Sequence, residues 1–342
     1  MALLETPAGT GAALARQTGP TSSRQRGGAG VTVRVSICIA TYRRPSQLAL
    51  LLQALNQLQF EAIAPPELDI IVVDNDAAGS ARSVCEPLQA TSSWPLHYAL
   101  EPQRGISYAR NRAIAQVAAE TDFLAFIDDD EVPDPVWLEA LLTAQSRHDA
   151  DVVWGPVIPI LNDPATPHWA IAGNFFQPRS FANGARLEFA STNNILIRAA
   201  IVREMGPAPF DRRFALTGGE DTHFFMRIHR AGHAIVWASE AIVRESVPAS
   251  RTTVKWILQR GFRSWGSHSL CERELKPGWG VQPIRFAKGL GLIGMGVALL
   301  PTAIAGKPAL VRSLLQIARG LGTLSGLVGY SFAEYGDRQG QP

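Results

Sequence analysis

Short apolar segments alternate with longer segments of helical periodicity along the first part of the chain. Residues 33–40, VRVSICIA, are apolar and β-branched, which is typical of a buried strand. In the next segment, RRPSQLALLLQALNQLQ, leucines recur on one helical face, with Ser46 as the expected N-cap. The alternation continues with a strand at 68–76, a helix at 105–120 and a strand at 122–130. We therefore expect an α/β fold with a mostly parallel sheet covered on both faces.

Two acidic clusters stand where strands of this sheet end: DND at 74–76 and DDDE at 128–131. Ligands of open parallel sheets bind beyond the carboxyl ends of the strands. Adjacent carboxylates repel one another, and we expect no basic residue nearby to neutralise the second cluster. Mg²⁺ and Mn²⁺ take carboxylate and phosphate oxygens. The pattern indicates a divalent-metal site formed by Asp128 and Asp130; the alternative is a solvated acidic turn in which Asp134 caps the next helix.

Composition divides the chain into two unequal parts. With 46% hydrophobic and 18% charged residues it suits a globular protein with a core. Residues 251–342 hold 12 Lys+Arg against 4 Asp+Glu, a net charge of +8, whereas residues 1–250 hold 20 against 26, a net charge of −6. This asymmetry predicts that the basic part contacts an anionic partner such as a membrane surface. Nucleic acid is a poor candidate for this partner, because the basic part is too apolar.

The three cysteines are far apart in the sequence, which fits a protein of the reducing cytoplasm.

Seven sequence segments occur in a fixed order. The first four are VSICIATYRRPSQLALLLQAL, DIIVVDND, RGISYARNRAI and DFLAFIDDDEVPDPVWLEAL, and the later three are VVWGPVIPIL, FASTNNILIRAAI and TGGEDTHFFMRIHRAGHAIVW. They resemble the successive blocks of family 2 inverting glycosyltransferases, over about residues 33–263. The resemblance implies a GT-A fold, a Rossmann-like sheet flanked by helices, and a nucleotide-diphospho sugar as donor. The stretch VRESVPASRTTVKWILQRGFRSWG is similar to a subgroup that builds bacterial exopolysaccharide units, including succinoglycan-type glucosyltransferases.

The resemblance implies roles for individual residues. Those expected at the nucleotide sugar are Thr41, Tyr42, Arg43, Asp74, Asp76, Arg104, Arg110, Asn111, Asp128, Asp129, Asn193 and Asn194. Asp74 would accept a hydrogen bond from the base, and without such a partner its burial would be costly. The arginines would lie near the diphosphate, and their alternative is a helix start with solvated side chains. For the asparagines the alternative is a turn in which they cap backbone groups. Asp128 and Asp130 would hold Mg²⁺ or Mn²⁺, which would neutralise the leaving diphosphate.

The segment TGGEDTHFF matches the family's Glu-Asp motif, in which the Asp removes the proton of the acceptor hydroxyl. Asp221 is that residue here, and Glu220 is its orienting neighbour. The alternative is an acidic residue at a helix N-terminus, which is compatible with catalysis. Many metal-dependent relatives add a His ligand after the following strand. This chain has no His there, and Glu245 is the nearest substitute.

Three regions are expected. Residues 1–30 are rich in Gly, Ser, Thr and Arg and indicate a disordered leader, residues 31–250 form the glycosyltransferase domain, and residues 251–342 form membrane-associating helices. Apolar and basic residues at 254–265 predict an amphipathic helix that lies on an anionic membrane or packs on the catalytic domain. For the uncharged run at 289–306 we favour a hydrophobic hairpin in the cytoplasmic leaflet, with one membrane span as the alternative.

The implied activity is transfer of a hexose from a nucleotide-diphospho sugar, expected to be UDP-linked. The expected acceptor is polyprenyl-diphosphate-linked or another saccharide, and the expected location is the cytoplasmic side of the inner (plasma) membrane. The rival from another class is a catalytically silent sugar-nucleotide-binding or scaffold protein, against which the intact acidic pairs argue. A nucleotidyltransferase would need a Gly-rich loop with a nearby lysine after the first strand, and residues 1–250 contain no lysine.

Overall fold

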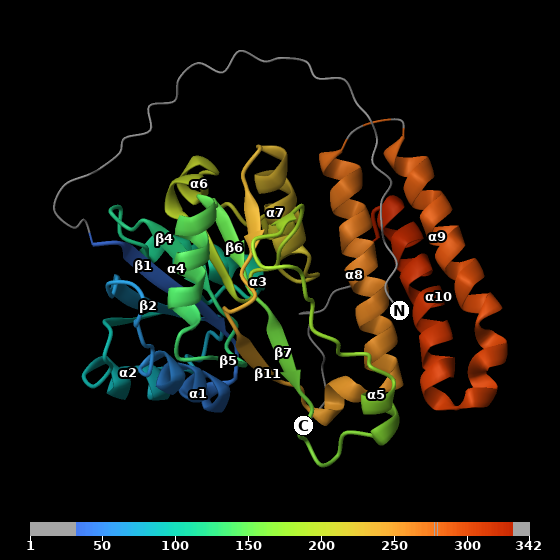
Figure 1. Ribbon diagram of the computed structural model, residues 1–342, viewed down its shortest axis with the longest axis horizontal. Coiled ribbons are helices and arrows are strands. Elements are labelled where there is room, and N and C mark those ends of the chain that lie inside the picture. The colour runs from blue at the N-terminus through green and yellow to red at the C-terminus, as the bar shows by residue number, and fades with distance from the viewer. Residues whose placement is uncertain (1–31, 277, 279, 331–342) are drawn as a thin grey trace. The chain divides into compact units, whose positions relative to one another are not determined.

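The computed structural model describes residues 32–276, 278 and 280–330. The leader expected at 1–30 lies outside the described residues. The strands of the main sheet are β1 (Arg34–Thr41), β2 (Glu67–Asp74), β3 (Leu96–Leu100), β4 (Phe123–Phe126), β6 (Val152–Trp154), β8 (Arg186–Leu187), β9 (Ile195–Arg198) and β10 (Ile235–Trp237). They lie in the order β3-β2-β1-β4-β9-β6-β10-β8. Figure 1 labels β1, β2, β4 and β6 of this sheet. Only β9 and β8 run antiparallel to their neighbours, so the mostly parallel sheet expected from the sequence is confirmed.

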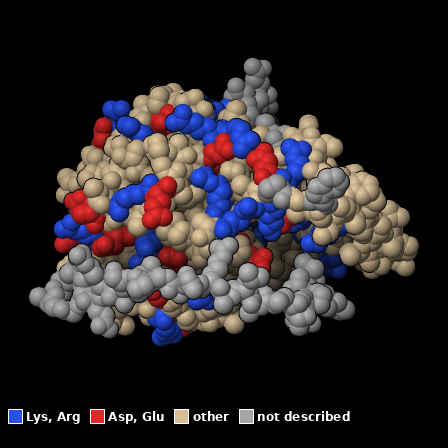
Figure 2. Space-filling view, turned by 90° about the horizontal axis from the view of Figure 1, so that it is seen from above, with Lys and Arg blue, Asp and Glu red and all other residues tan. Residues whose placement is uncertain are grey.

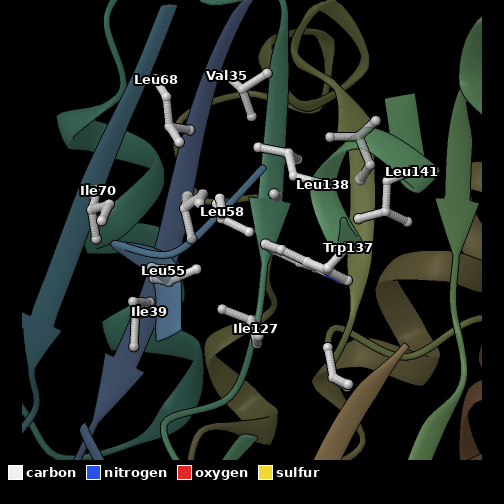
Figure 3. Packing of buried hydrophobic residues seen from close by; sticks show 14 of the residues in the cluster. Val35, Ile39, Leu55, Leu58, Leu68, Ile70, Ile127, Trp137, Leu138 and Leu141 are labelled. Atoms are coloured by element: carbon white, nitrogen blue, oxygen red, sulfur yellow. The ribbon is translucent and has the colours of Figure 1, made fainter. Parts of the chain in front are cut away.

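Helices cover both faces of the main sheet. One face carries α1 (Pro45–Leu55), α2 (Arg82–Gln89) and α4 (Trp137–His148), and the other carries α3 (Ile106–Gln116), α6 (Ala199–Glu204) and α7 (Glu220–Arg230). Alternate residues of each strand serve the two faces, which explains why the strands are apolar throughout. Figure 3 shows the packing on the face that carries α4, where Trp137 and Leu138 of that helix lie in one hydrophobic cluster with Val35 and Ile39 of β1.

Neither the expected N-cap Ser46 nor the alternative cap Asp134 is an N-cap in the structure. The N-cap of α1 is Arg44, and Ser46 lies inside the first turn. Pro45 takes the first helical position, where its missing N–H costs no hydrogen bond. The N-cap of α4 is Val136, and the Asp134 carboxylate pairs with Arg244 rather than capping that helix.

The expected site residues gather at one edge of the main sheet because of its topology. Strands β1, β2 and β4 are parallel and adjacent, so Thr41, Asp74 and the acidic loop after β4 end side by side. Strand β9 runs the other way, and its first residue pairs with the last residue of β4. The asparagines that precede β9 therefore arrive at the same edge.

A second, three-stranded sheet fastens the acidic loop. It consists of β5 (Glu131–Pro133), β7 (Val157–Ile160) and β11 (Val243–Ser246), in the order β5-β11-β7. Strand β5 begins directly after Asp130, and its Glu131 pairs in register with Glu245 of β11. The remaining short elements before the C-terminal helices are α5 (His168–Ala172) and η1 (Arg212–Phe214).

The last described segments are helical and lie side by side in Figure 1. They are η2 (Ala249–Thr252), α8 (Val254–Leu275), α9 (Val281–Ala298), η3 (Leu300–Ala305) and α10 (Lys307–Leu327). Of the two alternatives for 254–265, the structure has the packed helix: Ile257 is buried in a cluster with Phe176 and Val311. As for a membrane span at 289–306, no helix among the described residues combines the length and the apolar character needed to cross a bilayer.

Candidate active site

Arginines from distant segments surround the acidic loop that follows β4. The Arg44 guanidinium donates to Asp129 Oδ1 at 2.8 Å and to Asp130 Oδ2 at 2.9 Å. Arg251, in η2, donates to the same Asp130 oxygen at 3.2 Å. The expectation that no basic residue neutralises this cluster is therefore wrong, because the cations come from positions 85 and 121 residues away along the chain.

Arg110, at the start of α3, connects two of the predicted motifs. Its Nη2 donates to Asp128 Oδ1 at 3.3 Å, and its Nη1 forms an ion pair with Glu220. The Arg110 and Glu220 side chains are almost fully buried, at 8% and 5% exposure, whereas that of Asp128 is 43% exposed. One guanidinium thus links the acidic loop to the first residue of α7. The alternative of a solvated arginine does not hold for Arg110.

Asp221 follows Glu220 in the first turn of α7 and is half-buried. Its Oδ1 accepts hydrogen bonds from the N–H and the hydroxyl of Thr222, at 2.6 and 3.3 Å. Gly219, just before the helix, has a φ of +95°, and a Cβ there would lie 2.7 Å from the Cβ of Ser267 on α8. The residue before the helix that carries the candidate base therefore rests directly on a C-terminal helix, and only glycine fits there without strain.

A ring flanked by cations stands at the end of β1. The guanidinium carbons of Arg43 and Arg104 lie 5.0 and 5.2 Å from the ring centroid of Tyr42. Arg43 also donates to Asp76 at 3.2 Å. Burial acts to raise the pKa of Asp76, but hydrogen bonds from Arg43 and from the Ala78 N–H bring that pKa below its usual value. This group offers a π-face and positive charge at the edge of the sheet.

Thr41 and Asp129 face into the protein. The Thr41 hydroxyl donates to Asp129 Oδ2 at 2.8 Å, and both residues are buried. Burial raises the pKa of Asp129 to about 6, although Arg44 acts to lower it. Both residues were expected at the nucleotide sugar, whereas their side chains join the end of β1 to the acidic loop.

Asp74 has its hydrogen-bond partners within its own chain. It is fully buried, and its carboxylate accepts from the N–H groups of Asp76 at 3.0 Å and Ala81 at 2.7 Å and from the Tyr98 hydroxyl at 3.2 Å. The argument that its burial requires a hydrogen bond from a nucleotide base is therefore wrong.

Two expected site residues have structural contacts instead. The Asn111 side chain donates to the Phe210 carbonyl at 2.7 Å and accepts from the Phe210 N–H at 3.0 Å. Asn194 is fully buried and accepts from Trp137 Nε1 at 2.6 Å. Its Nδ2 donates to two backbone carbonyls, those of Pro156 and Ala241, both at 2.7 Å. For Asn194 the alternative of a side chain that bonds backbone groups is correct.

Asn193 and Glu131 support the acidic loop through hydrogen bonds. Asn193 Nδ2 donates to Glu131 Oε1 at 3.2 Å, and Glu131 Oε2 accepts from the Asp128 N–H at 3.0 Å. Burial, with a further contribution from the Asp128 charge, raises the pKa of Glu131 well above its usual value. Asn193 is half-buried and lies next to Asp128, so it remains a candidate for sugar binding.

The acidic loop offers two open carboxylate oxygens. Among the described residues no hydrogen-bond donor reaches Asp128 Oδ2 or Asp130 Oδ1, and no group of three His, Cys, Asp or Glu forms a metal cluster in that part of the chain. Glu245, the substitute for the missing His, accepts from Arg251 at 2.6 Å. Burial raises its pKa, and the neighbouring charge of Asp130 raises it further. Glu245 thus belongs to the same cluster of charged residues, but its carboxylate is paired with Arg251.

Comparison with known proteins places this chain in a family. The profile of glycosyl transferase family 2 matches residues 36–206, and that of glycosyl transferase family group 2 matches residues 123–320. The succinoglycan biosynthesis protein ExoM of Rhizobium meliloti is 34% identical over 317 residues, which cover 90% of this chain and 97% of that protein. The chain belongs to glycosyl transferase family 2. The family and the enzyme class expected from the sequence blocks are thereby confirmed.

More distant relatives of this family 2 glycosyltransferase agree with that assignment. Glycosyltransferase AglE of Haloferax volcanii is 26% identical over 215 residues, which cover 61% of this chain and 65% of that protein. A crystal structure of S. aureus TarS superposes with a TM-score of 0.50 and 15% identity, over 84% of this chain and 55% of the other. At that identity the superposition establishes a shared fold alone, and the expected GT-A fold is confirmed.

Sequence patterns missed two site arginines of this glycosyltransferase, Arg44 and Arg251. Arg44 directly follows the matched residues 41–43, so its position next to that block was an available signal. Arg251 had no signal, because its partners Asp130 and Glu245 are joined to it only by the fold.

We predict that Arg110→Gln destabilises this family 2 glycosyltransferase. The change removes a cation that pairs with buried Glu220, and removal of one partner from a buried ion pair costs about 3–5 kcal/mol. Urea unfolding followed by tryptophan fluorescence should show a clearly lower midpoint. Arg112→Gln is the matched control, since Arg112 is exposed on the same helix and its loss should change stability by less than about 0.5 kcal/mol. Equal midpoints for the two variants would contradict the role given to Arg110.

Proposed function

We propose that this glycosyltransferase moves a hexose, with inversion, from a UDP-linked sugar to a lipid-linked saccharide during exopolysaccharide synthesis. The name of the ExoM relative, a succinoglycan biosynthesis protein, supports the pathway class. The observation that carries the proposal is the Arg110 bridge. It fixes Glu220 beside the acidic loop, and so holds the carboxylate of Asp221 close to where a donor diphosphate would lie.

The proposed reaction is a single displacement. Asp221 takes the proton of the acceptor hydroxyl while that oxygen bonds to the anomeric carbon of the donor sugar. The bond from that carbon to the diphosphate oxygen breaks on the opposite face, and the nucleoside diphosphate leaves with the electron pair. Arg43 and Arg104 are suited to hold the departing phosphates by charge-assisted hydrogen bonds. Tyr42 offers its ring to the nucleotide base.

The acidic loop suits a divalent ion that takes most of its ligands from the donor. Mg²⁺ commonly uses one or two protein carboxylates together with phosphates and water. Asp128 and Asp130, each with one open oxygen, would hold it. The ion would offset negative charge on the leaving diphosphate. Repulsion among the aspartates is no argument for the metal, since Arg44, Arg110 and Arg251 already offset their charge.

The outer surface of α9 suggests where the reaction takes place. Two of its glycines face α10: a Cβ on Gly289 would lie 2.7 Å from Leu324, and one on Gly296 would lie 2.7 Å from the Ser313 carbonyl oxygen. The large apolar side chains are exposed instead, and in α9 and η3 these are Ile284, Phe286, Leu290, Met295, Val297, Leu300 and Ile304. A helix of a water-soluble protein normally has the opposite arrangement. In Figure 2 the visible surface at the end of the molecule where α9 and α10 lie is mostly uncharged.

We infer that this face binds the cytoplasmic side of the inner membrane. The uncharged run at 289–306 lies between Lys288 and Lys307, and residues 251–342 carry a net charge of +8 (12 Lys+Arg against 4 Asp+Glu). Basic residues near an anionic bilayer contribute roughly 1 kcal/mol each. Apolar insertion would add attachment that resists salt. A lipid-linked acceptor would be delivered at the same surface.

We predict that Asp221→Asn abolishes transfer and leaves donor binding intact, because the amide keeps the shape of the side chain and loses its basicity. General-base catalysis contributes about 10²–10⁴-fold, so turnover should fall by at least that factor. Transfer and hydrolysis are measured with UDP-, GDP- and dTDP-linked sugars, and Glu240→Gln, at an exposed carboxylate, is the control. Turnover within a few-fold of wild type would move the base to Glu220. Nucleotide binding without turnover on any donor, in the wild type, would favour the silent binding protein.

We predict that nucleotide-diphosphate binding depends on a divalent ion held at Asp130. Titration of UDP with Mn²⁺ present should give tighter binding than titration with a chelator. In Asp130→Asn this gain should shrink by about tenfold or more, since losing even an outer partner of a metal ligand has such an effect. Equal UDP affinity with and without Mn²⁺ in the wild type would show that the arginines suffice.

We predict that Ile304→Asp weakens membrane attachment. Ile304 is 96% exposed, so its side chain is free to insert into the membrane. Replacing it with Asp removes about 1.5–3 kcal/mol of binding free energy from apolar burial, which lowers the membrane affinity roughly tenfold or more. Co-sedimentation with phosphatidylglycerol vesicles measures it, and salt washes of cell membranes separate electrostatic from inserted contact. The control is Leu50→Asp, at an exposed leucine of α1. Wild-type protein that stays soluble in a detergent-free lysate would refute the membrane proposal and leave a second copy of the chain as the partner of this face.

A further inference from the structure

Arg179 lies between α5 and β8, near the candidate base but outside the motifs that the sequence patterns identified. Its guanidinium carbon lies 5.0 Å from the ring centroid of Phe189 and 5.5 Å from that of Trp154. The two rings pack edge to face with centroids 5.7 Å apart, and Trp154 Nε1 donates to the Asn193 carbonyl at 3.2 Å. Cation–π contact with these rings therefore holds Arg179 at the sheet edge where Asn193 and the acidic loop lie.

The guanidinium of Arg179 has no polar partner among the described residues, where it forms neither a hydrogen bond nor an ion pair. By contrast, Arg44, Arg110 and Arg251 all pair with carboxylates. A guanidinium presents five N–H donors in a planar fork that matches carboxylate and phosphate groups. The residue is exposed, so a ligand can reach this fork.

Asp221 lies within electrostatic range of Arg179. The Asp221 carboxylate bonds only to Thr222 in its own turn, and no cation within the described part of the chain lies at ion-pair distance from it. Protein atoms around the Arg179 guanidinium lower its pKa, and the charge of Asp221 partly opposes that change. The two charges are thus within electrostatic reach of each other without touching.

We propose that Arg179 binds an anionic group, a phosphate or a carboxylate, on the acceptor and thereby directs the acceptor hydroxyl towards Asp221. The proposal rests on the proposed function, in which Asp221 is the base. Stacking of a neutral sugar is disfavoured, because Trp154 is only 4% exposed and the guanidinium lies against both rings. The donor diphosphate has cations of its own at the end of β1.

The test uses the full-length protein saturated with UDP and Mn²⁺, so that the donor site is occupied. Calorimetric titration compares methyl glucoside, which is neutral, with methyl glucuronide and glucose 1-phosphate, which supply a carboxylate and a phosphate. At least one charged probe should bind about tenfold more tightly than the glucoside, as expected for a charge-assisted hydrogen bond. Tighter binding of methyl glucuronide would indicate an acidic saccharide as acceptor, and tighter binding of glucose 1-phosphate would indicate a phosphorylated acceptor.

Arg179→Gln should abolish this preference, and Arg179→Lys should keep part of it, since the charge remains and the fork is lost. Arg186→Gln, at an exposed arginine of β8, should leave it unchanged. Three outcomes would overturn the proposal: no preference in the wild type, a preference that survives in Arg179→Gln, or a fall in UDP affinity with that variant, which would assign Arg179 to the donor.

Asp221→Asn distinguishes failure of this proposal from failure of the proposed function. If that variant keeps turnover while Arg179→Gln loses the charge preference, the base is assigned wrongly and the anion site stands. If Asp221→Asn loses turnover and Arg179→Gln still prefers the charged probe, the base stands and the anion site is wrong.

Discussion

The bridge from Arg110 to Asp128 and Glu220 is the constraint on which the site depends. Each of the three residues lies on a different segment, and a buried guanidinium with two carboxylate partners tolerates little displacement of any of them. The bridge fixes the start of α7 relative to the end of β4. The distance from Asp221 to the acidic loop is therefore set by one side chain of α3, which itself takes no part in the proposed proton transfer.

Much of the fold could be predicted from the sequence, because a strand can be recognised from its local composition. The apolar runs at 33–40 and 68–76 and the leucine spacing between them are signals within a few residues, and the parallel sheet follows from their alternation. The start of α1 was missed because two local signals compete there: a serine suits the N-cap, but the proline before it suits the first helical position.

The site was predicted less completely, for a physical reason. Motifs locate carboxylates, but whether a carboxylate is open to a ligand depends on partners that only the fold supplies. Asp74 and Asn194 match family positions and yet bond to their own chain. The partners of Asp130 come from segments on either side of it, 86 and 121 residues away. No pattern along the chain contains these pairings.

The contact between Gly219 and Ser267 has a consequence for how such a chain can change over generations. The sequence divides by charge near residue 250, but α8 lies against Gly219, which precedes the helix of the candidate base, and Arg251 reaches Asp130. Substitutions on the inner face of α8 must therefore be matched by changes around Gly219, whereas substitutions on the outer face of α9 need only keep its apolar character. Helices that are neighbours in one bundle should thus diverge at different rates, α8 with the catalytic residues and α9 with its surroundings.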